Sequence, residues 1–343
     1  MAIPASRHLS TAELAQELGL DCSSSHLASI DEDALARLAE HIREHPDFSH
    51  YTRYTWDDPK FWLPEGSPSE RSQYLTIGNA VNFRFWSLAN GDVVPAGGLV
   101  AGDRLTGAMY MWRCLRRSLD QGTLPLLDAA FLANLDGEQL DLLFADDSGI
   151  NPLAIAREDR IANLRDLGAR LLRDWEGQFS NVIEAAATSL TEFVRLSATF
   201  RAFDDPLFKL TMVNAILHLG SGIATFDADP LPGIDYHLLK QLLRQGVVVP
   251  RPPLEDKLIL CKLLTADESY ELRRVALCAF VEISRQTCLS GEILDNKWWW
   301  NRRRCLTAEP VCLHSATAHE CPFLDACAQL TTFGIPVEET RRY

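Results

Sequence analysis

Hydrophobic residues along this chain recur mainly with the period of an α-helix. In residues 29–45, Leu35, Leu38, Ala39 and Ile42 repeat at i, i+3, i+4 and i+7, and Asp31 stands where a side-chain cap would begin a helix. We expect further amphipathic helices over residues 106–119, 155–175, 181–200 and 267–285. A cap for the last of these is expected at Asp267 or Ser269.

Three stretches depart from that pattern. Residues 51–70, YTRYTWDDPKFWLPEGSPSE, hold too many breakers for a regular element and are expected to wrap the surface or line a cleft. Residues 74–88, YLTIGNAVNFRFWSL, are rich in β-branched and aromatic side chains and fit either a strand or a buried helix. In residues 226–246, Pro and Gly mark a tight turn before a new apolar stripe, which predicts helix, hairpin, helix. The pattern predicts a mostly α protein with one main core.

Composition agrees with a globular chain. With 343 residues and 47% hydrophobic content, it can close one large domain or two smaller ones. There is neither a secretory leader nor a long uncharged apolar run, so we expect a cytoplasmic protein without a membrane partner. The nine cysteines are an odd number, and we expect reduced thiols available for metal rather than a disulfide framework.

Charge narrows the range of partners. A formal net charge of -14 counts against a protein that wraps nucleic acid, because such proteins concentrate Lys and Arg around phosphates. Duplex nucleic acid is therefore not expected as a partner. A small-molecule nucleotide or nucleoside fits better.

Four thiols gather near the end of the chain. Cys305, Cys312, Cys321 and Cys327 are separated by six, eight and five residues, and no pair has the C-x2-4-C spacing usual for zinc. A 4Fe-4S cluster accepts thiolates from longer loops and is the preferred prediction, with the arginines at 302–304 beside a negative site. Zinc assisted by His314 or His319, or no metal at all, remain alternatives.

A domain layout follows from that cluster. We expect one helical domain over residues 1–304, with possible lobes at about 1–150 and 151–304. Residues 305–343 would form a cysteine-rich metal-binding tail.

The tail resembles the C-terminal cluster loop of helix-hairpin-helix base-excision glycosylases, whose pattern is C-x6-C-x2-C-x5-C. CLTAEPVC at 305–312 keeps the first gap and CPFLDAC at 321–327 keeps the last, whereas the middle gap is six residues longer. LPGID at 231–235 is similar to the L-P-G-x-G hairpin of that superfamily. The resemblance implies a helix-hairpin-helix, glycosylase-like helical fold with a C-terminal cysteine-rich loop. It also implies a catalytic aspartate a little over twenty residues after the hairpin, where Asp256 lies.

A second resemblance covers most of the chain. NAVNFRFW at 79–86 is similar to the D-x-x-N-F-x-F-W segment of the queuosine salvage family, the queuosine 5′-phosphate N-glycosidases. Residues 105–122, 233–248 and 270–283 resemble three further family motifs in the same order. The chain is identified as a divergent member, in which Asn79 replaces an acidic residue and His237 stands where the family has Arg.

This second resemblance implies an N-glycosyl hydrolase. Its substrate would be queuosine 5′-monophosphate or a related 7-deazaguanine nucleotide or nucleoside, from which it releases the free base for queuine salvage. Hydrolysis of that bond needs no cofactor, so the cluster would be structural. Two other functions remain open: an iron-sulfur DNA or RNA base glycosylase of the helix-hairpin-helix type, and a non-enzymatic nucleobase-binding protein.

Cleavage of an N-glycosidic bond passes through an oxocarbenium-like sugar, so the site needs a carboxylate that stabilises the cation and orients or deprotonates water. Asp235, the aspartate of the family's D-Y-R signature, is the first candidate, and Asp256 is the second. Asp235 also begins a helix, and an N-terminal Asp is commonly a cap, so both roles are considered.

The remaining candidates would hold the substrate. Rings at Phe83, Phe85 and Trp86 would stack on the base, and Asn79 and Asn82 would bond its edges. The alternative role for these three rings is purely structural, as side chains packed in the hydrophobic core. The further candidates for substrate binding are Lys209 and His237 as phosphate contacts, Tyr236 in the pocket, and Glu271, which could instead pair with Arg273 or Arg274. We expect Asp235 and the aromatic segment to face one cavity.

Overall fold

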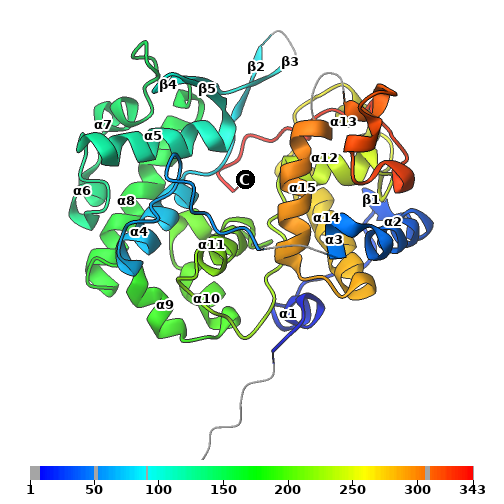
Figure 1. The fold of residues 1–343 in the computed structure, drawn as a ribbon, viewed down its shortest axis with the longest axis horizontal. Helices are drawn as coiled ribbons and strands as arrows, with labels where there is room; N and C mark the ends of the chain where they lie inside the picture. Colours follow the sequence, from blue (N-terminus) through cyan, green and yellow to red (C-terminus); the bar gives the residue numbers. More distant parts are fainter. Residues whose placement is uncertain (1–7, 50–52, 90–91, 306–309, 343) are drawn as a thin grey trace, which may run out of the picture. The chain divides into compact units, whose positions relative to one another are not determined.

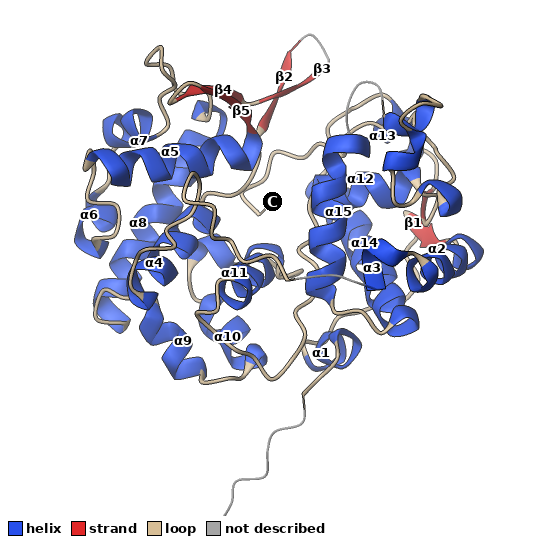
Figure 2. Ribbon diagram, viewed as in Figure 1, coloured by secondary structure: helices blue, strands red, loops and turns tan. Residues whose placement is uncertain are grey.

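The computed structural model describes residues 8–49, 53–89, 92–305 and 310–342, and most of its regular elements are helices (Figures 1 and 2). Internal contacts divide the chain into two compact units. The terminal unit comprises Met1–Arg53 and Asp227–Glu339, and the central unit comprises Tyr54–Phe226 and Thr340–Tyr343. The lobe boundary predicted near residue 150 falls inside the central unit, and most of the predicted cysteine-rich tail is part of the terminal unit.

The central unit is built mainly from eight helices among its described residues. They are α4 (Pro68–Ala80), α5 (Gly107–Gln121), α6 (Ala129–Asn134), α7 (Gly137–Leu143), α8 (Arg157–Asp174), α9 (Ser180–Ala186), α10 (Leu190–Ser197) and α11 (Lys209–Gly220). Short 3-10 turns lie at Ala154–Ala156 and Arg201–Phe203. Helix α8 packs against α6 and α4, and α4 packs against α11, which places α4 between two long neighbours.

Two antiparallel hairpins complete the central unit (Figure 2). Their strands are β2 (Trp86–Ala89), β3 (Asp92–Pro95), β4 (Gly97–Val100) and β5 (Asp103–Thr106). Trp86 pairs with Pro95 in the first hairpin, and Gly97 pairs with Thr106 in the second. A Cβ on Gly97 would come within 2.3 Å of a backbone oxygen of β5, so this position requires glycine.

The terminal unit combines segments from both ends of the chain. Its elements are α1 (Thr11–Glu17), β1 (Ala28–Ile30), α2 (Glu32–Glu44), α3 (Pro46–Ser49), α12 (Tyr236–Arg244), β6 (Val248–Pro250), α13 (Leu254–Ile259), α14 (Ala266–Thr287) and α15 (Gly291–Cys305). Three 3-10 turns follow at Val311–Leu313, Ala318–Glu320 and Leu324–Ala326. Helix α14 packs against α1, α2, α12 and α15, and β1 pairs antiparallel with β6.

The predicted helices are largely confirmed, with corrections at their ends. Asp31 caps α2 by accepting from the Ala34 N–H. Residues 181–200 form two helices instead of one, because Ala187 has a φ of 52° that ends α9. The cap of α14 is Thr265, in a capping box with Glu268, so the prediction of Asp267 or Ser269 is wrong.

The stretch 74–88, left open between helix and strand, contains both. It continues α4 through Ala80 and then enters β2 at Trp86. The preceding stretch, predicted to be irregular up to Glu70, already begins α4 at Pro68, where Ser67 and Glu70 form a capping box.

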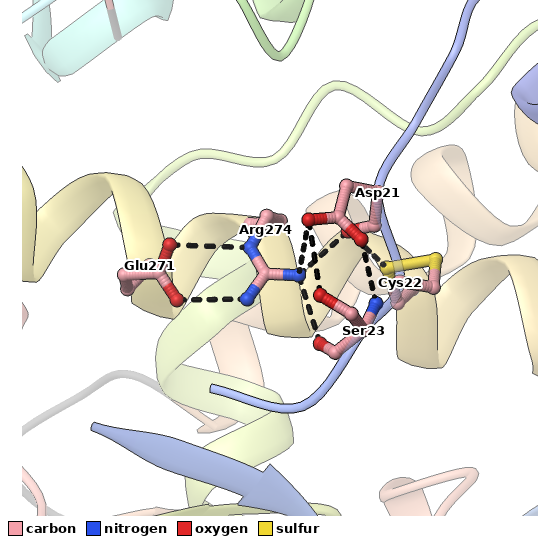
Figure 3. The surroundings of a disulfide bond; sticks show 6 residues. Asp21, Cys22, Ser23, Glu271 and Arg274 are labelled. Atoms are coloured by element: carbon pink, nitrogen blue, oxygen red, sulfur yellow. Dashed lines mark hydrogen bonds and ion pairs between the residues drawn. A yellow bond between two sulfur atoms is a disulfide. The ribbon is translucent and has the colours of Figure 1, made fainter. Parts of the chain in front are cut away.

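A disulfide bond joins Cys22 to Cys278 of α14, across a sequence separation of 256 (Figure 3). The expectation of reduced thiols is therefore wrong for this pair, whereas the other seven cysteines are free. Beside the bond, Arg274 donates to the backbone oxygens of Asp21 and Ser23 at 2.6 and 3.0 Å. These contacts fasten the N-terminal segment to α14.

Within the described ranges, none of the helices combines the length and the apolar character needed to span a bilayer.

Candidate functional site

The residues singled out from the sequence fall into two groups, one in each unit. Asp235, its neighbours and the cysteines belong to the terminal unit, and the segment around Asn82 belongs to the central unit. The expectation that Asp235 and the aromatic rings face one cavity stays a prediction. Each group is described by itself.

The Leu-Pro-Gly segment before α12 is held from two sides. The Gly233 N–H donates to Oδ2 of Asp295 in α15 at 2.7 Å, and Nε of Arg273 in α14 donates to the Ile234 carbonyl at 3.2 Å. The Pro230 carbonyl lies against Gly291, where an added Cβ would come within 2.2 Å. Helices α14 and α15 therefore fix the path of the chain just before Asp235.

Asp235 is the N-cap of α12 and is 8% exposed. Its Oδ1 accepts from the backbone N–H groups of His237 and Leu238 at 2.8 and 3.0 Å. Within the described part of the chain, Oδ2 makes no hydrogen bond. The capping role predicted as an alternative is thus present, and it occupies only one of the two oxygens.

Aromatic and cationic side chains surround this cap. Tyr236 is 5% exposed, and its ring lies 4.3 Å from that of His237. The guanidinium of Arg302, in the last turn of α15, stacks 3.4 Å from the Trp299 ring centroid. Burial lowers the pKa of Arg302 to about 10, with a contribution from Arg303, while Asp235 and Tyr236 act in the opposite direction. Arg302 is thus a cation within electrostatic reach of Asp235.

The other two acids of this unit lie in different surroundings. Glu271 accepts two hydrogen bonds from Arg274, at 3.2 and 2.8 Å, and these lower its pKa (Figure 3). Glu271 therefore forms the ion pair expected as its structural alternative, with Arg274 as the partner. Asp256 is exposed in the first turn of α13.

In the central unit, Asn79, Asn82 and Lys209 form one hydrogen-bonded group. Asn79 is fully buried near the end of α4, and its Nδ2 donates to the Leu210 carbonyl at 2.5 Å. The Lys209 ammonium, at the start of α11, donates to the Asn82 carbonyl at 3.0 Å. The Asn82 amide lies 3.5 Å from Oδ1 of Asn79.

The aromatic segment after Asn82 is clamped by Arg160 of α8. This guanidinium donates to the carbonyls of Phe83 and Arg84 at 2.6 and 3.2 Å, and it lies 4.7 Å from the Phe83 ring centroid. Phe83, Phe85 and Trp86 are 1%, 6% and 3% exposed. These rings are packed in the core, which agrees with the structural alternative. Their role in binding a base stays a prediction.

Two of the four C-terminal cysteines, Cys305 and Cys327, contact Arg244 at the end of α12, and the other two are Cys312 and Cys321. Arg244 donates to the Cys305 carbonyl, its Nη1 lies 3.8 Å from Cys305 Sγ, and its own carbonyl accepts from the Cys327 thiol at 3.6 Å. Electrostatic interactions join every pair of the four thiols. Burial raises the pKa of Cys327 to about 12 and also raises those of Cys305 and Cys321. Part of the link between the first two cysteines, residues 306–309, lies outside the described residues.

The described side chains do not form a compact single-ion site. Across residues 8–49, 53–89, 92–305 and 310–342, no three His, Cys, Asp or Glu side chains are grouped closely enough to hold one metal ion. The metal prediction therefore stays a prediction.

Sequence reasoning missed several cations. Arg160 stands four and seven residues before Leu164 and Leu167, so a charged residue interrupts the apolar stripe of α8, and that interruption is a usable signal. Lys240 and Arg244 gave no such signal, because they occupy the polar positions of α12. The chain that buries them, around Cys305 and Leu330, is distant in sequence.

Comparisons with known proteins agree with the motifs. A family model described as "Queuosine salvage protein" matches residues 63–214, all within the central unit. The queuosine 5′-phosphate N-glycosylase/hydrolase of Sphaerobacter thermophilus is 27% identical over 285 residues, which cover 78% of this chain and 83% of that protein.

Among solved structures, a similarity is found to 8-oxoguanosine complexed Pa-AGOG, an 8-oxoguanine DNA glycosylase from Pyrobaculum aerophilum. It covers 86% of this chain and 97% of that chain, with 15% identity and a TM-score of 0.49, a level from which neither fold nor function follows. The family match and the alignment with the Sphaerobacter protein agree with the collinear motifs, and both comparisons support the queuosine salvage family for this chain.

Proposed function

We propose that this chain is an N-glycosidase that hydrolyses the base-sugar bond of queuosine 5′-monophosphate, or of a related 7-deazaguanine nucleotide, and releases the free base. The observation that carries the proposal is the 27% identity over 285 residues to a queuosine 5′-phosphate N-glycosylase/hydrolase. The net charge of -14 also favours a single nucleotide over a nucleic-acid duplex.

Asp235 is proposed as the catalytic carboxylate. Its Oδ1 is held by two backbone N–H donors, which fix the orientation of the carboxyl group. Its Oδ2 is left to stabilise the oxocarbenium-like sugar or to accept a proton from the attacking water. Asp256 is the less favoured candidate because its side chain is exposed and water would screen its charge.

The substrate-binding residues are proposed from the central unit and from the start of α12. Asn79 and Phe83 would hold the segment in shape, because the Asn79 amide is engaged by Leu210 and Arg160 covers Phe83. Asn82, which is half-buried, would bond a base edge, and Lys209 would contribute positive charge toward the phosphate. The further candidates are Phe85 and Trp86 for stacking, His237 and Tyr236 beside Asp235, and Glu271.

Two finer features belong to the same proposal. The Leu-Pro-Gly segment before α12 would act as the hairpin of a helix-hairpin-helix fold, since α14 and α15 hold both its sides. The four C-terminal cysteines would bind a 4Fe-4S cluster, which supplies a structural tie and no electrons to the hydrolysis. Zinc is the alternative occupant.

The direct test is release of free base. Protein purified under anaerobic conditions is incubated with queuosine 5′-monophosphate, and free queuine is measured by chromatography and mass spectrometry. We expect release from the monophosphate at a rate well above that from guanosine 5′-monophosphate. No release, under conditions in which the Sphaerobacter protein is active, would overturn the proposal.

Two further measurements distinguish this proposal from a nucleic-acid base glycosylase and from a non-enzymatic nucleobase-binding protein. A duplex carrying 8-oxoguanine tests for base-excision activity, and salt-sensitive duplex binding would be required for it. A non-enzymatic binding protein would bind free queuine and release none, and Asp235→Asn would leave its affinity unchanged.

A further inference from the structure

Helix α12 carries two buried cations on one face. Lys240 and Arg244 are four residues apart and are 7% and 6% exposed. Arg244 donates to the carbonyls of Cys305 and Thr331, and its buried Nε has no hydrogen-bond partner in the part of the chain that the structure describes. Among the described residues, neither side chain pairs with a carboxylate.

Such an arrangement is unfavourable unless an anion is present. Transfer of a charge from water into a protein interior is energetically costly. Two like charges on adjacent turns of a helix also repel each other. Besides Arg244, the titratable groups that act electrostatically on Lys240 include the thiols of Cys261 and Cys305. Neutral thiols offer no compensating charge, whereas metal-bound thiolates do.

We propose that Lys240 and Arg244 are the counter-charges of an anionic metal-thiolate centre held by the four C-terminal cysteines. The charges balance: a four-iron core with two positive charges, or a single Zn²⁺, carries two net negative charges once bound by four thiolates. Arg244 and Lys240 supply two positive charges. Of the arginines at 302–304, Arg304 acts on Cys321, whereas Arg302 stacks on Trp299.

The four thiols are electrostatic neighbours of one another. Each of the four thiols interacts electrostatically with the other three, yet no three donors are close enough for a single metal in the described residues. Two of the cysteines also contact Arg244 directly: Cys305 through its sulfur and carbonyl, and Cys327 through its thiol. The sequence spacing of the four cysteines, which lacks a C-x2-4-C pair, favours a four-iron cluster over zinc.

The same contacts tie the centre to the candidate catalytic helix. The Arg244 carbonyl accepts from the Leu330 N–H at 2.9 Å, and the Gln245 carbonyl accepts from the Ala328 N–H at 3.4 Å. Asp235 caps the opposite end of this helix. Lys240 and Arg244 are thus positioning residues that hold α12 against the metal loop.

The test uses Lys240→Met, which removes the charge and keeps an unbranched apolar chain, beside Lys262→Met as a matched exposed control. Metal is loaded anaerobically, and iron, acid-labile sulfide and zinc are counted per chain. We expect Lys240→Met to bind the metal about 10–100-fold more weakly than the unaltered chain, as measured by competition with a chelator. In the metal-free protein we expect the opposite sign, a melting temperature above that of the unaltered chain, because an uncompensated buried cation has been removed.

These readouts depend on the proposed metal centre and not on hydrolysis, so failure of one proposal can be told from failure of the other. Iron with labile sulfide, or zinc, at one centre per chain supports the inference, and colour and sulfide distinguish the two. Absence of bound metal after loading with either would overturn it. So would identical behaviour of Lys240→Met and Lys262→Met in both states.

Discussion

A carboxylate at the start of a helix can cap the helix with one oxygen and act on a substrate with the other. Asp235 has this arrangement, since both hydrogen bonds from His237 and Leu238 end on Oδ1. The two readings of this residue, cap and catalyst, are therefore compatible. Asparagine separates them, because its carbonyl oxygen can still cap while it offers no carboxylate to the sugar.

Asp235→Asn is expected to lower kcat for base release by about 10²–10⁴-fold. Its melting temperature should remain within a few degrees of the unaltered chain, because the cap is retained. Base release and thermal unfolding are measured on the same preparation. Asp267→Asn, an exposed acid in the first turn of α14, is the matched control and should change neither.

Asp256→Asn tests the second candidate in the same assay. If Asp256→Asn removes turnover and Asp235→Asn keeps it, the assignment of the carboxylate is reversed. If neither substitution lowers turnover, both assignments are wrong.

A buried histidine makes the stability of the central unit depend on pH. His218 is fully buried, and burial lowers its pKa to about 4, while its hydrogen bond to the Asn214 carbonyl acts in the opposite direction. An unfolded histidine titrates near 6.5. Between these values the unfolded chain binds a proton that the folded chain does not, so stability falls as pH is lowered from about 6.5 to about 4. The loss attributable to this group is about 3 kcal/mol.

His218→Gln should therefore reduce the pH dependence of unfolding, although it lowers stability near pH 7. Urea unfolding is followed at about pH 7 and about pH 4.5, and the difference between the two is compared among variants. His26→Gln, at an exposed position, should keep the full difference. An equal difference for His218→Gln and the unaltered chain would refute the role of this histidine.

At the scale of elements, the terminal unit depends on a close approach between the Leu-Pro-Gly segment and the start of α15. Gly291 permits it, because a Cβ there would lie 2.2 Å from the Pro230 oxygen and 2.8 Å from Pro232 Cδ. The Gly291 N–H donates to Thr11 Oγ1, so α1 is joined to the same point. Contacts with α1, α14 and α15 therefore fix the backbone that leads into Asp235.

Gly291→Ala is expected to destabilise the protein by about 1–3 kcal/mol, although alanine is the better helix former. The clash is with backbone, which cannot turn aside, so we also expect lower turnover as Asp235 shifts. Gly137→Ala is the matched control, also at the first position of a helix, where the Cβ meets only the end of the Arg157 side chain. Thermal unfolding of both variants decides: equal stability would show that the approach at Gly291 is not tight.

The extent of sequence prediction also differs among elements. Helix α2 could be predicted with its cap, because periodicity and Asp31 are local features. The break between α9 and α10 could not, since Ala187 is a good helix former whose positive φ is set by its surroundings. Of the candidate site, the cap at Asp235 followed from the sequence. Its clamp by Asp295 and Arg273 depends on contacts with residues far along the chain.

At the scale of the whole molecule, the division of the chain into two units could not be predicted from its sequence. The first 53 residues belong with residues 227–339, and the segment between them forms its own unit. No composition shift marks these borders, because both units are helical and have similar apolar stripes. The long-range link that could be checked against an expectation, the Cys22–Cys278 disulfide, contradicts the prediction of free thiols.

That disulfide gives a test of how the terminal unit is held together. It closes a loop spanning 256 positions, so removing it restores much conformational entropy to the unfolded chain and should cost about 2–5 kcal/mol. A Cys22→Ala, Cys278→Ala double variant should melt at a lower temperature than the unaltered chain without reductant. With reductant, the two should converge, because the covalent link is then absent from both. Cys288→Ala, which removes an exposed free thiol, should melt as the unaltered chain does in either condition.

Two other outcomes would contradict this prediction. If reductant does not change the melting temperature of the unaltered chain, and seven or fewer thiols are accessible after denaturation, the bond resists reduction. Nine accessible thiols without reductant would mean that the bond does not form.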